Sequence, residues 1–405
     1  MNDHSGLNRV ECPVGPDTSA SRRVSRRAPT LSRRSDGVQA YVHRETHRVW
    51  PTPDRGPSRL ACRRARGWFG QGTIESMRVA AVQLNVALAD VPANLAACES
   101  LARDAARAGA QAIALPEFFT TGAAVVPELA NAALAPDGAA TDMLLRLSRE
   151  ERVLIGGSFL CRDADGEVRN AFLLVGPDGL LGRHDKDLPT MWENALYVGG
   201  DDDGVIEAPD LTVGAAVCWE FMRSGTARRL RGSVDLVMGG SNWWSIPQWP
   251  PTAYTRRAEA ANAVTAAYAP SVFGRYVGAP VAHAAITGEF SCPMPELPAV
   301  TYHGHFQGGA QIADAHGRVL ARREGSEGSG YVIAAVEAQR TKPREQVPDR
   351  FWLHRRGAVG AIAWNTERLL GRRWYARHVR GRPPLTLDPA PVRAGRGDDS
   401  LTPHP

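Results

Sequence analysis

The stretch Leu211-Thr212-Val213-Gly214-Ala215-Ala216-Val217-Cys218-Trp219-Glu220 determines the interpretation of the whole chain. Six of its first seven residues are small or apolar and no charge interrupts them, which predicts a buried strand that runs into a loop. Cys218 therefore lies where this strand ends, before a short helix expected near residues 226–231. Helix N–H groups at such a junction are expected to lower the pKa of the thiol and to favour the reactive thiolate. A buried structural cysteine is the alternative, and the rest of the sequence has to decide between them.

Length and composition restrict the class of protein. At 405 residues the chain is long enough for one large domain or two ordinary ones, and 43% of its residues are hydrophobic. No apolar run approaches the roughly 18 residues of a membrane span. The six cysteines form no CxxC pair and have no regular spacing, so neither a zinc site nor a disulfide framework is indicated. These features predict a soluble cytoplasmic protein.

The positive charge is concentrated at the N-terminus. Residues 1–76 contain 14 Arg, no Lys and seven Asp or Glu, a net charge of +7, so the remaining residues carry −2 of the overall +5. Because this segment lacks apolar periodicity, we expect a disordered extension or a start codon assigned too early, with Met77 as the true beginning. A basic arm that binds nucleic acid is a further interpretation, which the mildly acidic remainder disfavours.

Lysine is rare in this chain. Only Lys186 and Lys342 occur beside 46 arginines, and the abundance of Ala, Gly, Pro and Arg indicates a GC-rich coding sequence. Arg then serves wherever a generic positive charge suffices. A retained Lys, unless retained by chance, marks a position where a compact ammonium does what a guanidinium cannot.

Residues 77–337 mix strand and helix patterns without a linker, which predicts one α/β domain. Strand patterns cover 78–84, 111–115, 153–159, 171–175, 180–183, 211–217, 234–239, 278–285, 309–313, 319–322 and 331–336. Helical spacing of apolar residues covers 94–108, 136–151, 226–231 and 256–268. Residues 338–380 carry several aromatic side chains and are expected to form a partly helical tail that packs on the domain or on another subunit. Residues 381–405 are rich in Pro and Gly and are expected to be disordered.

Three ionisable residues follow predicted strands. Glu117 stands in Leu115-Pro116-Glu117-Phe118, Lys186 follows His184-Asp185, and Cys218 ends the stretch quoted first. α/β folds collect their active sites at the carboxyl ends of strands, so we expect the three side chains to meet. Glu, Lys and Cys in this order, separated by 69 and 32 residues, form a specific pattern.

From about Arg78 to Val336 these motifs resemble those of the nitrilase, or carbon–nitrogen hydrolase, superfamily. The resemblance rests on Leu115-Pro116-Glu117, Asp185-Lys186-Asp187-Leu188, Met191-Trp192-Glu193, Val217-Cys218-Trp219-Glu220, Ser241-Asn242-Trp243-Trp244 and Arg256-Arg257-Ala258-Glu259. It implies an α-β-β-α sandwich, a Glu-Lys-Cys triad and a homo-oligomer. It also implies hydrolysis of a non-peptide carbon–nitrogen bond without metal or organic cofactor.

The chemistry of the residue types supports the same roles. Glu117 is expected to take the thiol proton and later to activate water, while Cys218 attacks the substrate carbon and forms a covalent intermediate. Lys186 and the backbone N–H of Trp219 are expected to hold the oxyanion, each donor being worth about 3–4 kcal/mol. Glu193 resembles the family's second glutamate and is expected to orient Lys186 or the water, with a surface salt bridge as the alternative.

Several side chains near these motifs are candidates for substrate binding. Trp192, Trp219 and Trp243, together with Asn242, are expected to contact an apolar or small aliphatic substrate, although each Trp is also typical of ordinary packing. His283 is expected to be a core histidine. Residues 269–306 are longer and richer in Pro and Gly than the family core requires, which favours a lid or an interface loop.

The sequence therefore predicts an amidase-like hydrolase that releases ammonia or an amine from a small molecule. A nitrilase with the same triad is the nearest alternative, and a catalytically silent scaffold of the same fold is a second. A nucleic-acid binder that uses residues 1–76 is a third. We expect neither nucleic acid nor membrane as a partner.

Overall fold

A computed structural model describes residues 76–294, 299–343, 345–354 and 358–387. The chain divides into two units, residues 1–62 and 63–405, and the first lies outside the described residues. The extension expected over residues 1–76 is therefore outside them, apart from Ser76. Of the expected tail 381–405, residues 381–387 are described, and Leu385 forms a bridge with Leu134 there.

In the described residues twelve strands form one sheet, nine of them in the order β5-β4-β3-β2-β1-β9-β8-β7-β6, with β12 paired to β1, β10 to β9 and β11 to β10. The strands are β1 (Met77–Asn85), β2 (Ala112–Glu117), β3 (Leu154–Arg162), β4 (Val168–Gly176), β5 (Gly179–Asp185), β6 (Val205–Glu207), β7 (Thr212–Val217), β8 (Leu236–Ser241), β9 (Val281–Pro293), β10 (Thr301–Ala313), β11 (Val319–Glu324) and β12 (Gly330–Val336). The path folds on itself, so β2 lies against β8 and β9, and β3 lies against β8.

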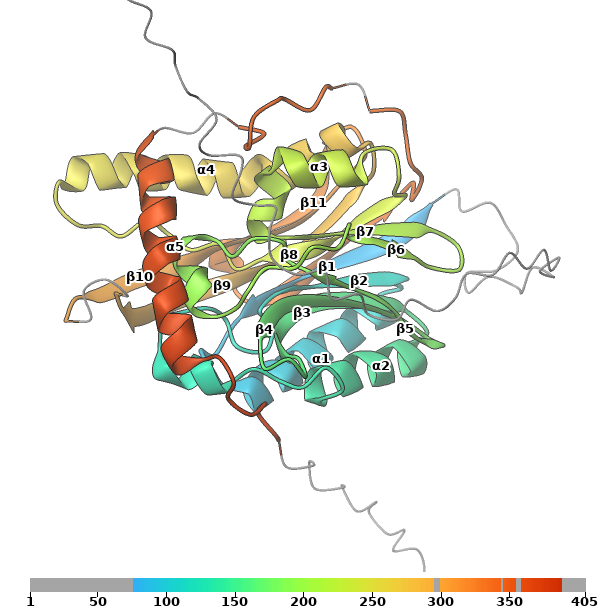
Figure 1. Ribbon diagram of the computed structural model, residues 1–405. Coiled ribbons are helices and arrows are strands. Elements are labelled where there is room, and N and C mark those ends of the chain that lie inside the picture. Colours follow the sequence, from blue (N-terminus) through green and yellow to red (C-terminus); the bar gives the residue numbers. More distant parts are fainter. Residues whose placement is uncertain (1–75, 295–298, 344, 355–357, 388–405) are drawn as a thin grey trace, which may run out of the picture. The chain divides into compact units, whose positions relative to one another are not determined.

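Helices cover both outer faces of this folded sheet (Figure 1). The helices are α1 (Val91–Arg107), α2 (Ala139–Glu151), α3 (Ser224–Leu230), α4 (Thr252–Val277) and α5 (Ala358–His378), with short 3₁₀ helices η1 (Pro127–Asn131), η2 (Met191–Ala195), η3 (Cys218–Met222) and η4 (Gly325–Glu327). Helices α1 and α2 pack on one face, and α3 and α4 pack on the other. The expected α-β-β-α sandwich is confirmed.

Alternation of side chains along the strands explains these layers. In β1, Ala80 and Val82 belong to the apolar cluster that also includes buried residues of α1 and α2, whereas Val79 and Ala81 belong to the cluster between the two sheet halves. The same holds for β7, whose Ala216 joins a third cluster with residues of α3 and α4. Successive side chains of a strand point to opposite faces, so a strand buried on both sides reads as a continuous apolar run.

The two halves approach closely where β2 and β8 end. A Cβ added at Gly240 of β8 would lie 2.7 Å from the Cα of Pro116 and 3.1 Å from the backbone N of Glu117. Glycine is therefore required for this approach. It brings the end of β8 against the residue that ends β2.

The segment expected to be a lid or an interface loop is regular structure instead. Helix α4 continues to Val277 although Pro270 lies inside it, and β9 and β10 pair as a long antiparallel hairpin, with residues 295–298 outside the described part. Buried Ala266, Ala269, Phe273 and Val277 recur at helical spacing. Their packing outweighs the low helix propensity of Pro and Gly, which was the signal behind the wrong expectation.

Helix α1 begins earlier than its apolar pattern predicts. Asp90 caps it through a hydrogen bond from the Ala93 N–H, and Pro92 lies in its first turn. Asn94, the expected first residue, is buried and bonds to the backbone of Ala87 and Thr120. None of the described helices combines the length and apolar character needed to cross a bilayer.

Candidate active site

The four residues proposed as catalytic converge at strand ends. Glu117 is the last residue of β2, Lys186 follows β5, Cys218 follows β7, and Glu193 lies on η2. All four side chains are buried, with at most 1% exposure. One carboxylate oxygen of each glutamate and the Cys218 Sγ lie within 4.8 Å of one another.

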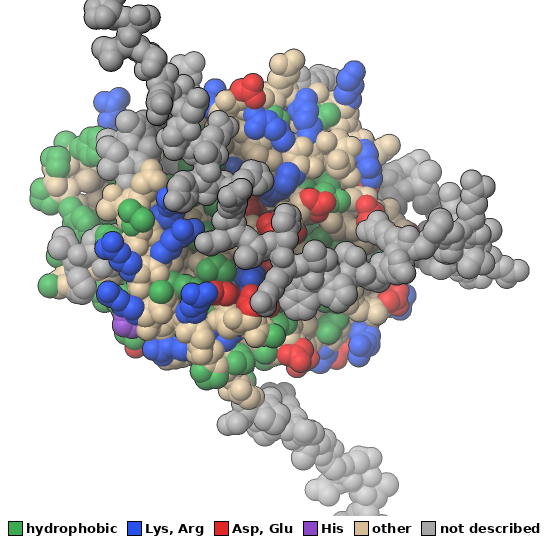
Figure 2. Space-filling view, in the orientation of Figure 1, with side chains coloured by type: hydrophobic (Ala, Val, Ile, Leu, Met, Phe, Trp, Pro, Cys, Tyr) green, Lys and Arg blue, Asp and Glu red, His purple; other side chains and the backbone are tan. Residues whose placement is uncertain are grey.

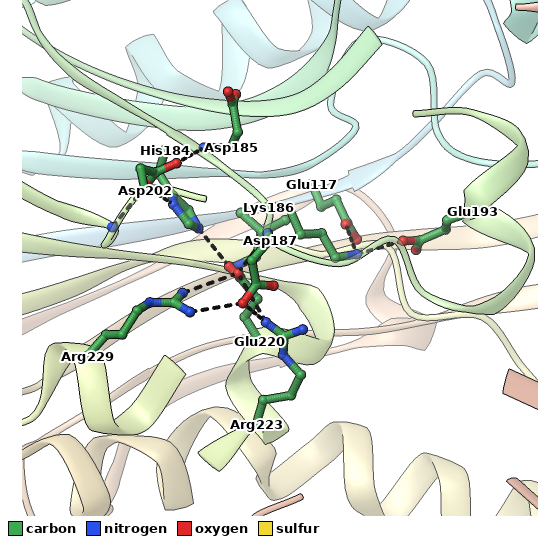
Figure 3. Close-up of polar contacts among 12 residues, drawn as sticks. Glu117, His184, Asp185, Lys186, Asp187, Glu193, Asp202, Glu220, Arg223 and Arg229 are labelled. Atoms are coloured by element: carbon green, nitrogen blue, oxygen red, sulfur yellow. Dashed lines mark hydrogen bonds and ion pairs between the residues drawn. The ribbon is translucent and has the colours of Figure 1, made fainter. Parts of the chain in front are cut away.

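Lys186 lies between the two glutamates (Figure 3). Its Nζ is 2.8 Å from Glu117 Oε1 and 2.7 Å from Glu193 Oε2. Burial alone lowers the pKa of Lys186, but the carboxylates of Glu117 and Glu193 outweigh burial and raise it well above its ordinary value. Lys186 is therefore a fixed ammonium, and a carboxylate on each side compensates its charge.

Both oxygens of Glu117 have fixed partners. Besides Lys186, Oε1 accepts a hydrogen bond from the Asn170 Nδ2 at 2.8 Å, and Oε2 accepts one from the Asn242 backbone N–H at 2.9 Å. Asn170 comes from β4, and Asn242 directly follows β8. Elements of both sheet halves thus orient the carboxylate that the sequence proposes as the base.

Glu193 is held by its own short helix. Its Oε2 accepts hydrogen bonds from the Thr190 N–H at 2.8 Å and from the Tyr197 hydroxyl at 2.5 Å. Burial raises the pKa of Glu193 and Lys186 opposes that rise. The buried Oε1 has no hydrogen-bond partner within the described residues, so it is an acceptor available to a bound molecule. The alternative of a surface salt bridge is wrong, because this glutamate is 0% exposed.

Cys218 forms the turn between β7 and η3. Its φ of +55° lies in the left-handed region, which costs a non-glycine residue on the order of 1 kcal/mol or more. The expectation that helix N–H groups lower its pKa is wrong. Burial and the neighbouring Glu117 carboxylate raise the pKa of the Cys218 thiol well above its ordinary value, and Lys186 opposes them only in part. The resting group is a thiol that needs a base.

Three of these side chains offer atoms that could ligate a metal ion. Across the described residues, Glu117, Glu193 and Cys218 are the one group of three that brings ligating atoms together. The Lys186 ammonium already lies at hydrogen-bond distance from both carboxylates. A metal ion there would have to displace it, so the donor set does not fit a resident metal.

The four tryptophans of the motifs lie together near the cysteine. Trp192, Trp219, Trp243 and Trp244 are each at most 8% exposed, and the centroids of Trp192 and Trp244 are 4.6 Å apart. The Trp243 Nε1 donates a hydrogen bond to Asn262 of α4, which fixes the orientation of this indole. Trp219 stacks on Trp364 of α5 at 5.7 Å and meets Trp352 edge-on at 5.5 Å.

The side chain of Asn242 remains a candidate for substrate binding. Its Nδ2 and Oδ1 are buried and neither has a hydrogen-bond partner within the described residues. His283 is a core residue, as expected. It bonds to the Ser241 Oγ at 2.7 Å, packs on Phe221, and burial lowers its pKa to about 3.

Sequence reasoning assigned no role to Asn170 or Tyr197, although each contacts a glutamate of the site. Asn170 lies in β4 between Arg169 and the apolar run that begins at Ala171, so no local signal distinguishes it from a polar residue at the edge of a strand. Tyr197 follows η2 without any local signal. Trp352 and Trp364 belong to residues 338–380, for which the sequence predicts only a packing tail.

Comparison with known proteins finds one protein family and several similar proteins. A sequence model of the family described as "Carbon-nitrogen hydrolase" matches residues 78–346. A nitrilase from Pyrococcus abyssi is 30% identical over 174 residues, which cover 41% of this chain and 65% of that protein. Omega-amidase NIT2 from Mus musculus is 32% identical over 193 residues, which cover 42% of this chain and 68% of that protein.

Solved structures show the same fold. A carbon–nitrogen hydrolase from Helicobacter pylori G27 has a TM-score of 0.52 and 14% identity, and the match covers 65% of this chain and 90% of that one. Nit3 from Saccharomyces cerevisiae, described as a member of the nitrilase superfamily, has a TM-score of 0.51 and 16% identity, with the same coverage.

Proposed function

The chain belongs to the carbon–nitrogen hydrolase family, and on that basis we propose that it hydrolyses a small-molecule amide through a cysteine thioester. The observation that carries the proposal is Lys186, whose Nζ lies 2.8 Å and 2.7 Å from two buried glutamates beside the Cys218 thiol. The products would be a carboxylic acid and ammonia, or an amine where the amide nitrogen is substituted.

In the first step Glu117 takes the proton of the Cys218 thiol as sulfur attacks the amide carbon. The raised pKa of the thiol makes such a base necessary. The carbonyl π electrons move to oxygen, which Lys186 Nζ and the Trp219 N–H would stabilise as an oxyanion. The tetrahedral intermediate then expels the nitrogen, which leaves as ammonia with the proton that Glu117 holds.

In the second step water replaces the leaving group. Glu117 accepts a proton from water and the hydroxide attacks the thioester carbon. The C–S bond then breaks as Glu117 gives the proton to the departing sulfur, which yields the acid and the thiol again. Glu193 Oε1 is a buried acceptor without a partner within the described residues. It would orient either the amide nitrogen or the incoming water, while Oε2 keeps Lys186 in place.

Nitrile hydrolysis is the second candidate, because one of the similar proteins is a nitrilase. Cys218 would add across the C≡N bond to form a thioimidate, and water would convert that to a thioester with release of ammonia. The same groups would serve both reactions.

The remaining proposals concern the setting of the reaction. No resident metal or organic cofactor is required, since Lys186 supplies the positive charge that the oxyanion needs. Trp192, Trp219, Trp243 and Asn242 would contact the substrate. We also propose that the protein is a homo-oligomer and that it works in the cytoplasm. The free cysteines of the described residues support the cytoplasmic location.

A panel of small amides and nitriles tests the proposed function. Wild-type protein should release ammonia from at least one of them, and Cys218→Ala should release none while keeping its melting temperature. Cys161→Ala, a buried cysteine outside the four catalytic candidates, is the matched control and should keep its activity. A panel that yields no ammonia would favour the silent scaffold.

A further inference from the structure

A second cluster of charged side chains, partly buried, lies beside the catalytic residues (Figure 3). Its members flank Lys186 in sequence or come from the loop that precedes β6, the turn after Cys218 and helix α3: His184, Asp187, Asp202, Glu220, Arg223 and Arg229. None of them was assigned a role in the reaction above. The ion pairs inside the cluster connect the segment of the lysine with the segment of the cysteine.

Glu220 is the group that contacts both segments. Its Oε2 accepts the Val217 N–H at 2.9 Å, one residue before Cys218, and meets His184 Nε2 at 2.9 Å, two residues before Lys186. Its Oε1 accepts the Asp187 N–H at 3.2 Å, on the other side of Lys186. The Glu220 carboxylate therefore contacts the chain before and after Lys186 and the residue that precedes Cys218.

His184 is held between two carboxylates. Its Nδ1 lies 2.5 Å from Asp202 Oδ1, while its Nε2 is on Glu220, and its side chain is 0% exposed. A carboxylate accepts hydrogen bonds, so both ring nitrogens must donate and the ring must be an imidazolium. Asp202 is itself fixed by the N–H groups of Asp185 and Gly204.

Two arginines complete the balance of charge. Arg223 and Arg229 both pair with Asp187, and each has an Nη2 atom 3.6 Å from Glu220 Oε1. Three cations thus face three carboxylates in the cluster. Buried ion pairs contribute little net stability compared with apolar packing, whereas they hold a defined geometry. Cys218 needs such restraint because its φ is +55°.

We propose that Glu220, locked by His184, is a positioning residue that fixes Cys218 and Lys186 relative to each other. This inference rests on the proposed function and adds to it. Glu220 bonds to His184 and to the N–H groups of Val217 and Asp187, and His184 bonds to Glu220 and Asp202, so both would act through the residues that they hold. Without the link, the cysteine turn and the lysine segment would move independently, and a misplacement of about 1 Å can lower a rate on the order of 100-fold.

The test compares His184→Gln, Glu220→Gln and the double variant with the exposed controls His316→Gln and Glu337→Gln. Two rates are measured per folded molecule: kcat on the best substrate, and alkylation of Cys218 by iodoacetamide. Each single variant should lose about 30- to 100-fold in kcat with KM changed less than about threefold. The double variant should lose no more than the worse single variant, because both break one link.

The alkylation rate tests the positioning role separately from the proposed function. If wild type turns over no substrate, the proposed function fails, but slower alkylation of Cys218 in both single variants would still support the positioning role. Alkylation and kcat within about threefold of wild type would overturn it. So would losses that add in the double variant, because they would mean independent effects.

Asp202→Asn provides a milder variant if the others fail to fold. Of the two ring nitrogens of His184, Asp202 contacts only Nδ1, and the Asp202 side chain is 35% exposed. The groups that face His184 are Asp202, Glu220 and, beyond Glu220, Arg223 and Arg229. Removing one carboxylate charge weakens the hold on the proton, so the alkaline limb of the activity profile should move to lower pH than in wild type. An unchanged limb would contradict the proposal.

Discussion

Lys186 is the residue on which composition and geometry agree. It is one of two lysines among 46 arginines, and its ammonium is buried between Glu117 and Glu193 at hydrogen-bond distance from both. A guanidinium keeps the charge but is planar and larger, and it distributes the charge over a fork. A site built around a single point charge between two carboxylates should not accept it without moving one of them.

We therefore expect Lys186→Arg to lose at least about 100-fold in kcat, the scale of one lost oxyanion donor. Steady-state kinetics measures the loss. Lys342→Arg is the matched control, because Lys342 is exposed and lies after the last strand; it should behave as wild type. A near-normal kcat for Lys186→Arg would reduce Lys186 to a generic charge.

His184 predicts how stability depends on pH. Burial lowers the pKa of His184, but the carboxylates of Glu220 and Asp202 outweigh it and raise the pKa from 6.5 to about 10. A raised folded-state pKa gives stability that is fully present below the unfolded pKa and is lost as pH rises through the folded one. The stability from the ion pairs should thus be complete at pH 6 and disappear towards pH 10.

Urea unfolding of wild type and His184→Gln at pH 6, 8 and 10 checks this expectation. The difference in free energy of unfolding should shrink as pH rises, by at most about 1.4 kcal/mol per pH unit. His316→Gln should match wild type at every pH. A difference that stays constant or grows with pH would mean that His184 is neutral in the folded protein.

Helix α5 contacts the site more directly than the sequence predicts. Its aromatic residues predicted a packing tail, and the structure places Trp364 on Trp219 and the helix against η2, which carries Glu193. The exposed side of α5 carries Arg372, Arg373 and Arg377, and Figure 2 shows blue side chains over this helix. Near its C-terminal end, Tyr375 donates to Glu167 and accepts the Val168 N–H.

Gly371 lies where α5 packs tightly on η2. A Cβ at this position would lie 2.9 Å from the Ala195 backbone N and from the Asn194 Cβ. Gly371→Val should push η2 away and displace Glu193, lowering kcat about 10- to 100-fold. Ala376→Val, exposed on the same helix, controls for the lower helix propensity of Val. If both variants kept the kcat of wild type, α5 would have no influence on the site.

The elements that sequence could predict are those with local signals. The strands before Glu117 and Cys218 are apolar runs of the right length, so the strand-end placement of both residues followed from periodicity. The η3 turn did not, since the left-handed φ of Cys218 depends on the surrounding cluster. Helix α4 was predicted too short because burial, which sequence does not show, carries it past Pro270. The Tyr197 contact with Glu193 also depends on tertiary placement alone.

At the scale of the whole molecule, the family match begins at residue 78 and β1 begins at Met77. Together with the composition of residues 1–76, this supports the proposal that the hydrolase domain starts there. Deleting residues 1–76 should leave activity unchanged and the melting temperature within a few degrees, because the segment has little apolar surface to bury. A thermal melt and a kinetic assay of the shortened chain test it. A larger fall would show that the segment packs on the domain.

In the proposed mechanism Cys218 carries the acyl group of the substrate. The most direct measurement mixes the protein with its best amide, quenches with acid during turnover, and determines by peptide mass spectrometry which residue is acylated. We predict a thioester on Cys218, and none in Cys218→Ala, which should be folded and inactive. An acyl group on another residue, or turnover that persists in Cys218→Ala, would show that Cys218 is not the nucleophile.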